Sequence, residues 1–104
     1  MNSKDLLFEL HLTTEDLKIS QISSFVDLCI KNKGKPLIIQ LSKGNFINQP
    51  MFSKILSSDS LKNVLLKANE YKNLFKENNF HTKRIKIEIS SEIVNLIKQP
   101  IENS

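Results

Sequence analysis

A histidine and several charged residues near the two ends of this chain are the side chains that could do acid–base or ligand chemistry. Glu9 and His11 lie two residues apart in one alternating segment, and Lys86 and Glu88 do so in another. Residues two apart in a strand point to the same face of a sheet. Histidine and carboxylates can exchange protons near neutral pH, and lysine can hold an anion. The four residues are candidates for one site if both segments lie in one sheet.

The tripeptide His-Leu-Thr at residues 11–13 matches a His-x-Thr pattern and resembles one half of the 2H phosphoesterase signature. That resemblance implies cleavage of cyclic phosphates by two such motifs facing each other, one histidine acting as base and the other as acid. The His-Thr pair at residues 81–82 lacks the intervening residue, so a dimer would have to supply the second motif. A phosphate-processing hydrolase centred on His11, with Lys86 and Glu88, is therefore an alternative function, and no other catalytic machinery is recognisable.

The single cysteine and the two histidines indicate little further chemistry. Cys29 lies between Leu28 and Ile30 at an apolar helical position, which is typical of a small buried hydrophobe rather than a nucleophile. One cysteine forms no internal disulfide, so we expect a reducing, cytoplasmic location. Two histidines without a cysteine or aspartate cluster at ligand spacing make a poor zinc motif, and we expect no metal and no cofactor.

Three segments have the pattern of β-strands. Residues 6–13 and 83–90 alternate apolar and polar side chains, whereas residues 35–42 form a nearly continuous apolar run that favours an interior position in the sheet. We expect Leu37, Ile39 and Leu41 to point toward the core with the apolar sides of the other two strands. The opposite face then carries the predicted ligand-binding residues: Glu9, His11, Gln40, Ser42, Arg84, Lys86 and Glu88.

Two long helices and one short helix are expected between and after these strands. The first begins at Ser20 and ends at Gly34, which is expected to take the left-handed conformation. The second begins at Asp59 or Ser60 and keeps apolar residues at helical spacing for four turns, to the asparagines at 78–79. A short C-terminal helix is expected over residues 91–98.

The connection over residues 43–58 is too long for a featureless loop in a compact domain, and residues 51–56 have the composition of a short strand. Its apolar residues could cap the end of the sheet. They could also contact a partner protein, since exposed apolar clusters mark interfaces. The residues of this candidate partner loop are Phe46, Gln49, Met51 and Phe52.

These elements predict an α/β (α+β) two-layer sandwich with both long helices on one face of the sheet. With the short strand the order is β-α-β-β-α-β, the ferredoxin-like arrangement; without it a small three-stranded sheet remains. The length of 104 residues indicates a single domain over residues 1–104, with residues 1–4 and 101–104 frayed.

The charge distribution leaves one further function open. The net charge is +4, and residues 31–54 contain five lysines and no acidic residue, so weak nucleic-acid binding there is an alternative. We regard nucleic acid as the less favoured partner, because such lysines are usually solvated. We expect no membrane association, because no apolar run is long enough to span a membrane. The leading hypothesis is a small binding or accessory module that self-associates and uses its polar sheet face for a protein or a small anionic ligand.

Overall fold

The computed structural model describes residues 5–41 and 46–89, with side chains for 5–38 and 49–89. Within these residues the chain forms a mixed α+β domain with four long strands and two α-helices. The elements are, in order, β1 (Leu6–Thr14), β2 (Leu17–Lys18), the 3-10 turn η1 (Ile19–Gln21), α1 (Ile22–Lys31), β3 (Lys35–Leu41), β4 (Phe46–Ser58), α2 (Leu61–Glu77) and β5 (Thr82–Ile89).

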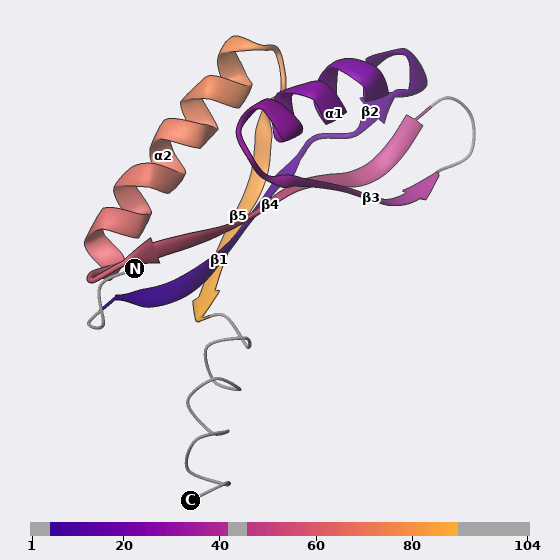
Figure 1. Ribbon diagram of the computed structural model, residues 1–104. Coiled ribbons are helices and arrows are strands. Elements are labelled where there is room, and N and C mark those ends of the chain that lie inside the picture. The colour runs from indigo at the N-terminus through magenta and orange to yellow at the C-terminus, as the bar shows by residue number, and fades with distance from the viewer. Residues whose placement is uncertain (1–4, 42–45, 90–104) are drawn as a thin grey trace, which may run out of the picture.

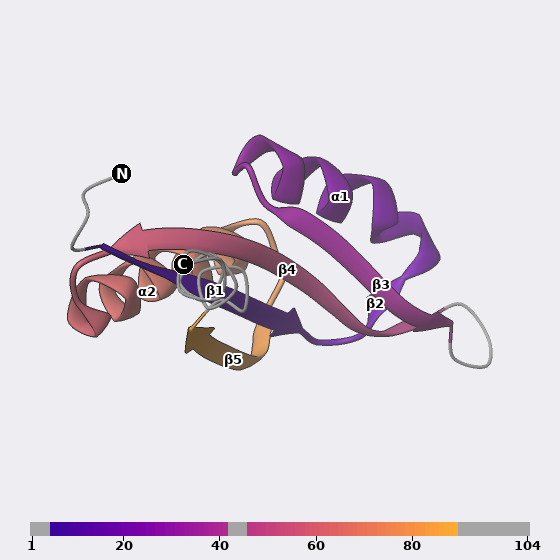
Figure 2. The ribbon, with the colours of Figure 1, turned by 60° about the horizontal axis from the view of Figure 1, so that its bottom comes forward.

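The sheet is antiparallel and has the order β3-β4-β1-β5, with the two-residue β2 pairing with β4 beyond the end of β1. Both helices lie on one side of it (Figure 1). The prediction that residues 35–42 form an interior strand was wrong: β3 is an edge strand that pairs only with β4 within the described residues (Figure 2). Pro36 suits an edge, because it has no N–H to donate to a second neighbour.

The strand expected over residues 51–56 is the longest in the structure. It extends over 13 residues as β4 and holds the sheet together, because its two sides pair with β1 and with β3. The segment predicted as a partner loop is therefore mostly a central strand. Phe52 within it is 0% exposed and belongs to the core, so it is not available to a partner.

The core lies between the helices and the apolar side of the sheet. Phe8, Leu10 and Leu12 alternate along β1 and are all buried, as their spacing predicts. Phe25 of α1 and Phe75 of α2 meet edge to face, with ring centroids 5.9 Å apart, and this contact joins the two helices over the sheet.

The helix boundaries follow local chemistry. Ser60 caps α2 by accepting a hydrogen bond on its hydroxyl from the backbone N–H of Asn63 at 3.2 Å, and Asn79 takes the left-handed conformation with φ 68° beyond its end. After α1 it is Lys33, with φ 58°, that takes this conformation rather than Gly34 as predicted. Gly34 is required for another reason: a Cβ there would overlap the ring of Phe52.

The remaining predicted elements have mixed outcomes. β5 begins and ends within one residue of the predicted last strand. The predicted helix over residues 91–98 and the expected frayed ends, residues 1–4 and 101–104, lie outside the described residues. In the part of the chain that the structure describes, no helix has the length and apolarity to cross a membrane.

Candidate functional site

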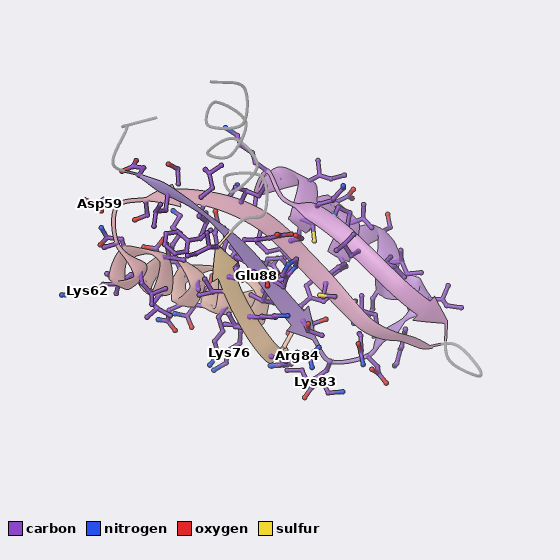
Figure 3. The ribbon with its side chains drawn as sticks, turned by 90° about the horizontal axis from the view of Figure 1, so that it is seen from below. Asp59, Lys62, Lys76, Lys83, Arg84 and Glu88 are labelled. Carbon is purple, nitrogen blue, oxygen red and sulfur yellow. The ribbon has the colours of Figure 1, made fainter. Side chains whose placement is uncertain are left out.

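The predicted site residues of β1 and β5 share the sheet face that points away from the helices. Because Leu10 and Leu12 point into the core, the intervening residues point the other way. The antiparallel register then places three pairs directly opposite one another on that face: Glu9 with Glu88, His11 with Lys86, and Thr13 with Arg84. Figure 3 looks onto this face with the helices behind it, and shows Glu88 and Arg84 toward opposite ends of β5.

His11 is the centre of a compact charged cluster. Its Nε2 atom lies 3.2 Å from Oε1 of Glu9 and 3.6 Å from Oε1 of Glu88. Nζ of Lys86 lies 3.9 Å from the other carboxylate oxygen of Glu88. The His11 side chain is 18% exposed, against 31% for Glu9 and 47% for Glu88, so the ring is held between two carboxylates that remain open to solvent.

A pocket with a volume of about 430 Å³ adjoins this cluster. Its lining residues come from β1, β4 and β5: His11, Thr13, Met51, Arg84, Lys86 and Glu88. The pocket is open on one side, so a small ligand could enter without any movement of the backbone. It is also the place where residues far apart in the sequence converge, since 70 residues or more separate β1 from the outward residues of β5.

The charges of this face are divided along the strands. The two carboxylates lie together at the Glu9 end, whereas Arg84 and Lys86 lie toward the Thr13 end. Among the described residues Arg84 makes no ion pair, and the contact of Lys86 with Glu88 is long and exposed. Such a contact contributes little stability, so both cations are free to engage a ligand.

His11 also has an unsatisfied nitrogen. Its Nδ1 atom is buried and has no hydrogen-bond partner among the described residues. A buried polar atom without a partner is uncommon in proteins and costs free energy. In the described part of the chain, Nε2 of His11 therefore contacts two carboxylates, whereas Nδ1 has no hydrogen-bond partner. This buried nitrogen lowers the stability of the fold at the middle of the polar face.

Two predicted ligand-binding residues, Gln40 and Ser42, are not placed in this site. Gln40 pairs by its backbone with Asn48, but its side chain lies outside the described residues, as does Ser42 entirely. The inward position predicted for Leu37 was wrong. Leu37 pairs with Met51, which itself pairs with Thr13, so Leu37 lies on the face of His11.

The residues of the candidate partner loop fall into different environments. Met51 lines the pocket, Gln49 is exposed with φ 53°, and Phe52 is buried in the core. The side chain of Phe46 lies outside the described residues. The three described side chains, Gln49, Met51 and Phe52, do not form one surface.

Sequence reasoning missed two pocket residues as ligand contacts. Thr13 is two residues from His11 in the same strand, and this spacing already placed it on the predicted polar face. Its side chain is 2% exposed and lines the pocket. Met51 contributes an apolar wall to the pocket, and only the register of β4 against β1 reveals its place.

Other candidates for chemistry are structural. Cys29 is fully buried, and burial raises the pKa of its thiol to about 12, so it is a core residue and no nucleophile. His81 is exposed, and its carbonyl accepts a hydrogen bond from the backbone N–H of Glu15 at 2.9 Å. Its side chain is not part of the pocket lining.

Within the described residues, the fold and the site together define a class: a small α+β domain with a two-helix layer on one side of its sheet and a pocket lined by charged residues on the other. No protein-family model, no curated protein and no solved structure matches the chain, so the function has to be argued from the site itself.

Proposed function

We propose that the protein is a small binding module that holds an anionic ligand on the polar face of β1 and β5. The observation that carries this proposal is the register of the two strands, which sets Arg84 opposite Thr13 and Lys86 opposite His11 around one pocket. A guanidinium, an ammonium, a hydroxyl and an imidazole are suitable donors for phosphate or carboxylate groups. The ligand is a free small molecule or an acidic group of a partner protein.

The Thr13 end of the pocket is the favoured position for the anion. The Glu9 and Glu88 carboxylates lie at the other end and would repel it. Arg84 has no competing carboxylate within ion-pair distance among the described residues, so no existing contact has to be broken. Arginine also offers two parallel N–H groups, which suit a planar or tetrahedral oxyanion.

A binding titration with inorganic phosphate and with short phosphate esters tests this proposal. Isothermal titration calorimetry on the full chain should detect binding that weakens as salt rises, because the attraction is electrostatic. Arg84→Gln should weaken binding at least tenfold. Lys83→Gln is the matched control, because it removes the same charge from the neighbouring position of β5, which points to the other face. Equal losses in both variants, or no binding at all, would contradict the proposal.

A hydrolase centred on His11 is the second candidate, and one contact favours it. Nε2 of His11 lies 3.2 Å from a Glu9 oxygen, and a carboxylate beside a histidine orients the ring in many acid–base sites. Lys86 and Glu88 would then serve the same reaction. Turnover of a cyclic phosphate by the wild-type chain, lost in His11→Gln, is the result that this candidate requires.

Nucleic-acid binding through the lysines of residues 31–54 has less support. Nζ of Lys54 donates hydrogen bonds to the carbonyl oxygens of Asn32 and Lys33, at 2.9 and 3.1 Å. Burial and then the nearby charges of Lys33 and Lys67 lower the pKa of Lys54. This lysine satisfies carbonyls after the end of α1, and is therefore less available to phosphate.

We also propose the ferredoxin-like arrangement, self-association and a cytoplasmic location for this domain. The strand order β3-β4-β1-β5, with α1 between β1 and β3 and α2 between β4 and β5, supports the first. The exposed Leu61 and Leu65 of α2, beside Ile85 and Ile87 of β5, support self-association, and the buried free thiol of Cys29 supports a reducing compartment. Light scattering at several concentrations tests the oligomeric state.

A further inference from the structure

We propose that Glu9, His11 and Glu88 form a binding site for a divalent transition-metal ion such as Zn²⁺. The sequence predicts no metal, because two histidines without a cysteine or aspartate cluster at ligand spacing make a poor zinc motif. The register of β5 against β1 brings the three residues together, with one donor atom from each residue lying within 4.8 Å of the others. This site goes beyond the anion pocket, because it occupies the acidic end of the face and needs neither Arg84 nor Thr13.

The two distances from His11 to the carboxylate oxygens fit a tetrahedral ion. With metal–ligand bonds of about 2.0–2.1 Å, two ligands of a tetrahedral zinc ion lie roughly 3.3–3.4 Å apart. Nε2 of His11 lies 3.2 Å from the Glu9 oxygen and 3.6 Å from the Glu88 oxygen. An ion could therefore contact all three atoms after small side-chain rotations, without a change of strand register.

The charges of the cluster also favour a cation. Glu9 and Glu88 are directly opposite on neighbouring strands, an arrangement in which like charges repel each other. Nε2 of His11 carries at most one proton, so it can donate to the two carboxylates only in turn. A divalent ion coordinated by all three residues would remove the repulsion and give both carboxylates a ligand at once.

The surroundings predict an open site of moderate affinity. Three protein ligands leave a fourth position for water or a ligand, and the 430 Å³ pocket lies beside it. Among residues 5–41 and 46–89, Nδ1 of His11 has no partner that would orient the ring, and such outer contacts are commonly worth 10- to 100-fold in metal affinity. Lys86, with Nζ 3.9 Å from Glu88, competes with the ion for that carboxylate.

Calorimetric titration of the chelator-treated full chain with ZnCl₂ tests the site. Wild type should bind one equivalent, and His11→Gln and Glu88→Gln should each weaken binding at least tenfold. The matched controls are His81→Gln and Glu70→Gln, an exposed histidine and an exposed glutamate outside the cluster. Both should bind as wild type does. Lys86→Gln should bind more tightly, because the competing ammonium is gone.

Cobalt gives a second readout that does not depend on heats of binding. Co²⁺ held by one nitrogen and two oxygens in a tetrahedral site absorbs visible light far more strongly, and at longer wavelengths, than the octahedral hexahydrated ion does. Circular dichroism checks that every variant folds. If His11→Gln does not fold, Glu9→Gln and Glu88→Gln still test the site, because Glu9 and Glu88 are more exposed than His11.

Unchanged affinity in both Glu9→Gln and Glu88→Gln, or an equal loss in His81→Gln, would overturn the metal site. Failure here is distinguishable from failure of the anion pocket. If metal-free protein binds phosphate in a manner that depends on Arg84, the anion pocket is supported even when zinc does not bind. If zinc binding depends on Glu88, the metal site is supported even when phosphate does not bind.

Discussion

Replacing Glu88 by glutamine in metal-free protein should leave the domain as stable as wild type or make it more stable. Glu88 lies opposite Glu9, and like charges placed directly across an antiparallel pair destabilise it. Cross-strand charge pairs are worth about 0.2–1 kcal/mol, so removing this repulsion should gain an amount in that range. A carboxylate that lowers the stability of the domain is typical of a binding site, whereas one in a structural network would raise it.

We expect the attraction that Glu88 loses to be weaker than this gain, because its contact with Lys86 is long and exposed. Its contact with Lys86 is 3.9 Å long, with the two side chains 66% and 47% exposed, and exposed pairs typically contribute about 0–1 kcal/mol. The amide of glutamine can still accept a hydrogen bond from His11. We therefore expect a net change in unfolding free energy between zero and about +1 kcal/mol, which corresponds to a rise in Tm of up to about 8 °C for a domain of this size.

Urea denaturation followed by circular dichroism, with a chelator present, measures this change. Glu70→Gln is the matched control, because it breaks an attractive pair with Lys67 one turn away on α2, at 3.2 Å. The control should lose about 0.2–0.5 kcal/mol, the opposite sign. A loss in Glu88→Gln as large as that of the control, or larger, would contradict this expectation, since the carboxylate would then be part of a stabilising network.

Two further predictions concern the layer that supports this face. Gly34→Ala should destabilise the domain by about 1–3 kcal/mol, because the added methyl group overlaps the buried Phe52 ring. The urea denaturation midpoint measures this change, and a loss below about 0.5 kcal/mol would contradict the predicted overlap. Burial raises the pKa of Cys29 from 9.0 to about 12, so the stability that this thiol contributes is fully present below pH 9 and is lost as the unfolded chain ionises above it. Between pH 9 and 10.5, wild type should therefore lose stability faster than Cys29→Ala, by up to about 1.4 kcal/mol per pH unit, and parallel pH profiles would contradict this.

The amphipathic elements could be predicted from the sequence because their two sides differ. β1 and β5 place leucine or isoleucine on one side and charged or polar residues on the other, so their faces were read correctly. Ser60 and Asn79 marked the ends of α2 for equally local reasons. The same local signals gave the polar face on which His11 lies.

Long-range pairing could not be predicted. β3 carries Leu37, Ile38 and Ile39 in succession, so both sides of the strand are apolar there. Such a run does not indicate which side faces the core or whether the strand lies inside the sheet or at its edge. Pro36 was the one available indication of an edge strand. The meeting of Glu9 with Glu88 depends on the register of strands separated by both helices, and no local pattern encodes it.

We propose that the face around His11 is the binding surface of this protein. Amide ¹H–¹⁵N spectra recorded while inorganic phosphate is added to metal-free protein test it most directly. We expect saturable shifts confined to residues 11–13 of β1, residues 84–88 of β5 and Met51 in β4, with α1 and α2 unchanged. Shifts concentrated on the lysines of residues 31–35 and 54, or no saturable shift at all, would contradict it.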